Sequence, residues 1–153
     1  MKKSSNITAI TLLLIQLSSI LLYYKKLPNR MIIHENIMGQ PDNYGSKTLL
    51  FVIFAISFLL FIMFQIIRKY PEKFNYPFFN EKYKELIYVK SQNLIDYLKI
   101  ITGLLFLVVI LKFTVFYNVS NKLLQGLLYS LIVLPFFVLG FYIRDLFKIS
   151  EKE

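Results

Sequence analysis

Hydrophobic residues in this chain gather in four long blocks, which lie at about residues 7–24, 48–67, 99–117 and 123–143. Each block is close to the roughly 20 residues that a helix needs to cross a hydrocarbon core about 30 Å thick. Inside lipid the backbone must be paired within one helix or in a closed barrel, and the blocks lack the alternation of barrel strands. The pattern therefore predicts an all-α, integral membrane four-helix bundle, folded as a single transmembrane domain over residues 1–153.

Two longer polar segments separate these blocks. We expect residues 27–47 to form an ordered outer loop between helices 1 and 2, with a turn at residues 41–43 because proline, aspartate and asparagine favour turns. Residues 68–97 join the second and third blocks. Beyond Asn80, a candidate helix cap, their apolar residues recur at helical spacing. This spacing predicts an interfacial amphipathic helix before helix 3, with a partner-docking helix as the alternative.

Composition and charge narrow the class of protein. A chain that is 56% hydrophobic is too apolar for a soluble domain of this size. The formal charge of +9 would suit a nucleic-acid partner, but cationic residues also accumulate in the cytoplasmic loops of membrane proteins. We therefore expect the lipid bilayer, and no nucleic acid, as a partner. The absence of cysteine excludes disulfides and thiolate metal sites, and no cofactor is expected.

The distribution of lysine and arginine predicts the orientation. With the N-terminus inside, twelve of the 18 cationic residues fall on the cytoplasmic side and six on the other. The prediction is a multi-pass protein of the cell membrane with both termini in the cytoplasm and the 27–47 loop outside, although Lys25 and Lys26 oppose it. Lys112, inside the third block, is expected to extend its ammonium group to the interface. The sequence leaves a homo-oligomer open.

The outer loop holds the only histidine of the chain. His34, Glu35 and Asp42 are weak candidates for a divalent metal site, because imidazole and carboxylate groups are common metal ligands. The alternative is that His34 and Asp42 bond to backbone groups and hold the loop against the helix ends. Ser46 has no evident activating base, so no catalytic residue is assigned.

A motif in the loop resembles that of a known family. The matching positions are Pro28, His34, Asn36, Gly39, Pro41, Asp42, Gly45, Ser46 and Lys47. They resemble the signature of the domain of unknown function 1648, which is the N-terminal module of the Sdp immunity-protein family and of many small bacterial membrane proteins. The resemblance extends to about residue 117 and marks the motif residues as a ligand site or as determinants of loop structure. The chain lacks tryptophan and the Arg-Thr-Pro-Trp stretch of the immunity protein.

Three functions remain open at this point. The first is a non-catalytic surface-sensing or immunity-like protein that uses residues 27–47 to bind a protein or peptide partner at the outer surface. The second is a metal-assisted membrane enzyme, which would need metal at His34. The third is a small transporter or assembly-partner subunit, which the scarcity of ionisable residues inside the apolar blocks disfavours.

Overall fold

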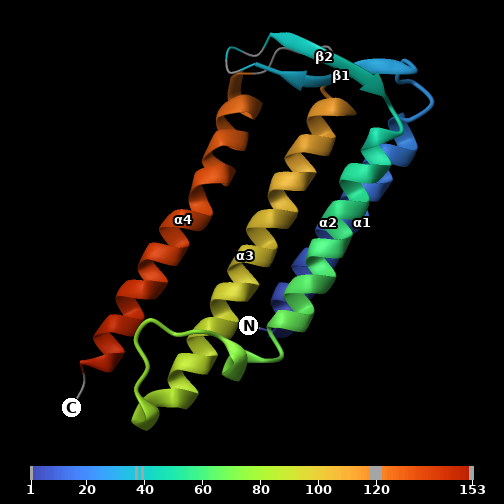
Figure 1. The fold of residues 1–153 in the computed structure, drawn as a ribbon. Helices are drawn as coiled ribbons and strands as arrows, with labels where there is room; N and C mark the ends of the chain where they lie inside the picture. The colour runs from blue at the N-terminus through green and yellow to red at the C-terminus, as the bar shows by residue number, and fades with distance from the viewer. Residues whose placement is uncertain (1, 37, 39, 118–121, 152–153) are drawn as a thin grey trace.

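The computed structural model describes residues 2–36, 38, 40–117 and 122–151. These residues form four long helices and one two-stranded antiparallel sheet (Figure 1). All four helices are long and apolar enough to cross a membrane. In chain order the elements are α1 (Lys2–Tyr23), β1 (Arg30–Glu35), β2 (Pro41–Ser46), α2 (Leu49–Ile67), the short 3₁₀ turns η1 (Pro71–Lys73) and η2 (Glu81–Tyr83), α3 (Lys84–Phe113) and α4 (Lys122–Ser150).

The helices run up and down, so the β-hairpin lies at one end of the bundle and both chain ends lie at the other (Figure 1). We call these the hairpin end and the terminal end. Helix α3 packs against α1, α2 and α4. Helix α4 leaves large apolar side chains exposed, among them Phe136, Phe137 and Phe141. An exposed apolar surface of this extent suits contact with lipid tails.

The predicted spans agree with the helices in number and order, and differ from them at the ends. Helix α1 begins at Lys2, five residues before the apolar block, and α4 continues to Ser150. Helix α3 ends at Phe113, not at residue 117. Apolar blocks therefore predict where the four long helices lie. They do not predict where each helix ends, because the ends include polar residues.

The prediction of an all-α fold missed the hairpin. Residues 41–43 were expected to turn, which is wrong, because they lie inside β2 and the chain reverses between Asn36 and Gln40. Antiparallel pairing joins Arg30 to Ser46 at the base and Glu35 to Pro41 near the tip, with irregularities around His34. Proline is compatible with the first residue of an edge strand, which is where Pro41 lies.

The predicted interfacial helix is not a separate element. Helix α3 runs without a break for 30 residues, about 45 Å at 1.5 Å per residue, and so exceeds the thickness of the bilayer core. Its first turns pack against the end of α4, where Ile87, Leu146 and Ile149 are buried. Asn80 is a cap as expected, since its side chain accepts a hydrogen bond from the Lys82 backbone at the start of η2. Ile87 of this segment thus packs on α4, whereas Leu86 is 41% exposed.

Charged side chains buried near the terminal end form a group that we call the ion cluster. The Asp96 carboxylate accepts hydrogen bonds from Arg68 Nε and from Lys99 Nζ, both at 3.0 Å. Lys99 also donates to Asn6 Oδ1 at 2.7 Å, and Gln65 donates to the same oxygen. Asp96 and Lys99 are 0% and 2% exposed. The cluster therefore links α1, α2 and α3, and the sequence analysis, which placed residues 68–97 at the interface, did not predict it.

A candidate ligand site beneath the hairpin

Asn36 shapes the tip of the hairpin. Its Oδ1 atom accepts hydrogen bonds from the backbone N–H groups of Met38 and Gln40, at 3.0 and 2.9 Å. The Asn36 backbone N–H donates to the Gln40 carbonyl, and the two side chains also bond to each other. Asparagine is favoured in turns because its side chain can bond to the backbone a few residues later. Gly39, another residue of the motif, lies outside the described residues.

His34 and Asp42 form a pair across the two strands. His34 Nδ1 lies 2.5 Å from Asp42 Oδ1, and the side chains are 66% and 45% exposed. The predicted proximity of these two residues is therefore present in the structure. Within the part of the chain that the structure describes, these two side chains bond to each other and not to backbone groups, so the contact runs between the strands and not from the loop to the helix ends.

The motif residues at the base of the hairpin connect it to the helices. Lys47 Nζ donates to the carbonyl oxygens of Tyr24 and Leu27, at 3.1 and 3.0 Å, and so satisfies carbonyl groups at and just beyond the end of α1. Ser46 Oγ accepts a hydrogen bond from the Thr48 hydroxyl at 2.9 Å, just before α2. Proline at position 28 lies exposed between α1 and β1. The base is thus tied to both α1 and α2.

Glu35, at the end of β1, is paired with α3. The Glu35 carboxylate accepts a hydrogen bond from Lys112 Nζ at 2.6 Å, and the two side chains are 20% and 19% exposed. Lys112 therefore reaches the end of the bundle, as its long side chain was expected to allow, and it has a specific partner there. This ion pair fixes the tip-proximal part of β1 over α3.

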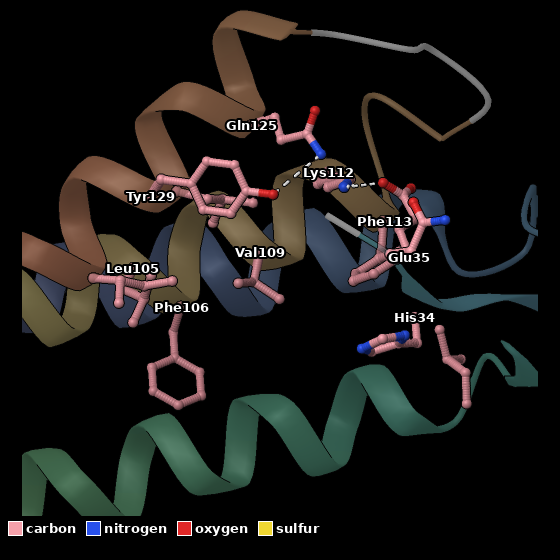
Figure 2. A pocket seen from close by; sticks show the side chains of 13 residues that line it. His34, Glu35, Leu105, Phe106, Val109, Lys112, Phe113, Gln125 and Tyr129 are labelled. Atoms are coloured by element: carbon pink, nitrogen blue, oxygen red, sulfur yellow. Dashed lines mark hydrogen bonds and ion pairs between the residues drawn. The ribbon is translucent and has the colours of Figure 1, made fainter. Parts of the chain in front are cut away.

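A pocket of about 350 Å³ lies between β1, α3 and α4, and we call it the hairpin pocket. Figure 2 shows its side chains, with the Lys112–Glu35 pair on one side and the Gln125–Tyr129 hydrogen bond nearby. The apolar part of the lining comes mainly from the helices and the polar part mainly from the hairpin and the α3 and α4 ends. The apolar members are Ile33, Leu105, Phe106, Val109, Phe113, Leu128 and Ile132, and the polar members are His34, Glu35, Asn36, Lys112, Gln125 and Tyr129.

The metal hypothesis for the loop gains no support from these positions. Glu35 is bound to Lys112, and the His34–Asp42 pair stands apart from it. Among the residues that the structure describes, no three histidine, aspartate or glutamate side chains converge as metal ligands would. The arrangement instead provides the hairpin pocket, which has an apolar interior and a polar rim.

The hairpin residues of this site were predictable from the sequence motif, but the residues that α3 and α4 contribute to its wall were not. Gln125, Tyr129 and Phe106 lie on α3 and α4, and nothing in their spacing distinguishes them from lipid-facing residues. Lys112 could have been identified from the sequence, because a lysine inside an apolar block requires an anionic partner or access to the membrane interface.

Four apolar helices with a hairpin at one end define a multi-pass membrane protein of the helical-bundle class. A more specific assignment comes from comparison with known families: the model described as "Domain of unknown function (DUF1648)" matches residues 11–63. The matched segment, made of α1 from residue 11 on, the hairpin and most of α2, is similar to that family, which confirms the resemblance seen in the motif. The match covers about a third of the chain and stops well before residue 117. No curated protein and no solved structure matches the chain.

Proposed function

We propose that this protein is a non-catalytic, surface-sensing or immunity-like membrane protein that holds an amphipathic peptide in the hairpin pocket. The proposal includes the orientation expected from the lysine and arginine count, with the hairpin outside the cell and both termini in the cytoplasm. An envelope-active peptide is the ligand class because such a peptide partitions to the membrane surface, where the pocket would lie.

The observation that carries the proposal is the composition of the pocket at its place in the bundle. The hairpin end is where the apolar stretch of α2 begins, at Leu49, and where Lys112 and Glu35 meet. These features support a position of the pocket at the border between lipid tails and water. Its apolar interior would contact the apolar face of an amphipathic ligand, and its polar rim would contact the polar face. Binding sites commonly combine apolar walls with a few placed polar groups in this way.

The contacts of the motif residues favour binding over catalysis. Asn36 is engaged in the turn, Lys47 in the end of α1, and Glu35 in the pair with Lys112. A nucleophile needs an adjacent base, and Ser46 instead contacts Thr48. These contacts stabilise a rigid hairpin, and a rigid wall lowers the conformational entropy lost on binding.

Filling the pocket tests the proposal. Val109→Trp places a large ring in the lining, while Val133→Trp places the same ring on α4 at a side chain that is 48% exposed. Cells lacking the protein should be more sensitive to an envelope-active peptide. The Val133→Trp variant should restore resistance and the Val109→Trp variant should not, at equal amounts of protein in the membrane. Unchanged sensitivity of the deletion strain, or full rescue by Val109→Trp, would contradict the proposal.

A further inference from the structure

A second cavity of about 330 Å³ lies between α3 and α4 at the terminal end, and we call it the terminal cavity. Its polar lining includes Lys90, Asn93 and Asp145, and its apolar lining includes Leu94, Val138 and Phe141. It shares no residue with the hairpin pocket. A ligand bound there would therefore contact none of the residues that line the hairpin pocket.

The terminal cavity lies where the surface of α4 changes from apolar to charged. Phe136, Phe137 and Phe141 are 72%, 62% and 58% exposed, whereas Arg144, less than one turn later, begins the charged end of the helix. On α3 the cavity is lined by Leu94 and Tyr97, which flank Asp96 of the ion cluster. Arg68, the partner of Asp96, follows the end of the apolar helix α2. In a bilayer that covers the apolar part of α4, the cavity would straddle the border of the membrane.

The lining of the terminal cavity holds one cation, Lys90, and one carboxylate, Asp145, and two further cations, Arg144 and Lys148, lie next to it on α4. Lys90 Nζ donates to Asp145 Oδ2 at 2.8 Å, and Arg144 Nη2 lies 3.7 Å from the other oxygen of the same carboxylate. One carboxylate therefore faces two cations, and Lys148 lies one turn beyond Arg144 on the same helix face. Lys90 and Arg144 remain 40% and 57% exposed at their side chains, which leaves them accessible to a further anion.

We infer that the terminal cavity is a binding site for an anionic phospholipid, with the phosphate near Lys90 and Arg144 and an acyl chain along Leu94, Val138 and Phe141. A phospholipid is the ligand that carries both a phosphate and a chain and is already present at this border. Basic pockets between membrane helices are known to select such headgroups. The proposed orientation places the cavity in the cytoplasmic leaflet, where anionic lipids are enriched.

Binding of lipid to the full-length protein tests this inference. The purified chain in a mild detergent would be titrated with phosphatidylglycerol, with phosphatidylcholine, and with inorganic phosphate alone, and the bound lipid counted by native mass spectrometry. We expect phosphatidylglycerol to bind in preference to phosphatidylcholine, and inorganic phosphate not to displace it. Equal binding of the two lipids, or displacement by inorganic phosphate at millimolar concentration, would overturn the inference.

Two kinds of variant localise the site. Arg144→Gln should weaken phosphatidylglycerol binding by about fivefold, since one cation near an anionic headgroup contributes about that factor. Val138→Trp fills the apolar part without changing a charge and should weaken both lipids. Lys73→Gln removes a cation at the terminal end outside the cavity lining and is the matched control. Wild-type affinity in Arg144→Gln and Val138→Trp, or an equal loss in Lys73→Gln, would show that the cavity is not the site.

Discussion

Gly45 shows why one residue of the family motif has to be small. A Cβ atom at this position would lie 2.8 Å from Ile33 Cδ1 and 3.1 Å from both Ile33 Cγ2 and Leu49 Cδ1. The glycine therefore allows β2 to approach the side chain of β1 and the first turn of α2. The sequence marked Gly45 as a motif position, but the need for close packing became visible only with the hairpin.

Gly45→Ala should destabilise the protein by about 1–2 kcal/mol, because Ile33 and Leu49 must shift to accommodate the methyl group. The measurement is thermal unfolding in detergent, followed by circular dichroism. Gly126→Ala is the control, since a Cβ atom there meets nothing within 4 Å. An unchanged melting temperature in Gly45→Ala would contradict the packing described for the hairpin base.

The structural role of Asp96 was not apparent from the sequence. This residue belongs to residues 68–97, which were expected to lie at the membrane interface, yet its side chain is fully buried between Arg68 and Lys99. Spacing along one helix indicates which residues share a face. It does not indicate that α1 and α2 cover that face.

Asp96→Ala should destabilise the protein by about 3–5 kcal/mol, because it leaves the buried charges of Arg68 and Lys99 without their counter-ion. Glu81→Gln breaks the exposed pair with Lys84 and should leave the melting temperature unchanged. If the two variants melted alike, the ion cluster would not be a stabilising contact.

At the scale of elements, the helices were predictable and the hairpin was not. Long apolar blocks have few alternatives to a helix inside lipid. The hairpin segment Pro41–Ser46 consists of Pro, Asp, Asn, Tyr, Gly and Ser, most of which are disfavoured in strands. The strand conformation of this segment depends on tertiary contacts. Its partner strand β1 contributes Met31, which is buried with Ile20, Leu50 and Ile110 under the sheet.

Lys47 is expected to control how firmly the hairpin is attached. Lys47→Met removes both hydrogen bonds to the Tyr24 and Leu27 carbonyl oxygens while keeping an apolar chain of similar length. Hydrogen exchange of the hairpin backbone should then become faster by about tenfold, as expected if roughly 1.5 kcal/mol of charge-assisted bonding is lost. Lys26→Met, at an exposed position over Tyr23, should leave the exchange rates unchanged. Equal protection in both variants would show that Lys47 does not anchor the hairpin.

The Glu35–Lys112 pair is expected to define the shape of the hairpin pocket. Glu35→Lys places two cations against each other. It should weaken the packing of β1 over α3 and, if the proposed function holds, resistance to an envelope-active peptide. Adding Lys112→Glu restores opposite charges with reversed sign and should recover the melting temperature of the native protein at least in part. Failure of the double variant to recover any stability would mean that the two residues do not act as a pair.

At the scale of the whole molecule, the bundle places its two candidate sites at opposite ends of the α3–α4 seam. Between them the seam is closed by Ile101, Val108 and Leu131, which are buried. Asp96 and Lys112 are separated by about 24 Å along α3, and the apolar helix α2 is about 28 Å long, both at 1.5 Å per residue. The distance along α3 between the ion cluster and the Glu35–Lys112 pair is thus close to the length of the apolar helix α2.

The sequence alone was sufficient to predict this up-and-down arrangement, because an even number of spans returns the chain to its starting side. It was not sufficient to predict the walls of either site. Gln125 and Tyr129 enter the hairpin pocket only because α4 packs beside α3, and that choice of neighbour is not encoded in the hydropathy of either helix.

Labelling of single cysteines on intact cells tests the central claim, which is that the hairpin and its pocket face the outside. The chain has no cysteine, so each introduced thiol reports one position. Met38→Cys lies at the tip of the hairpin, where the native side chain is 84% exposed, and Lys73→Cys lies at the terminal end. If the hairpin faces outward, a membrane-impermeant maleimide should label position 38 in intact cells and position 73 only after lysis. Labelling of position 73 but not 38 in intact cells would contradict it.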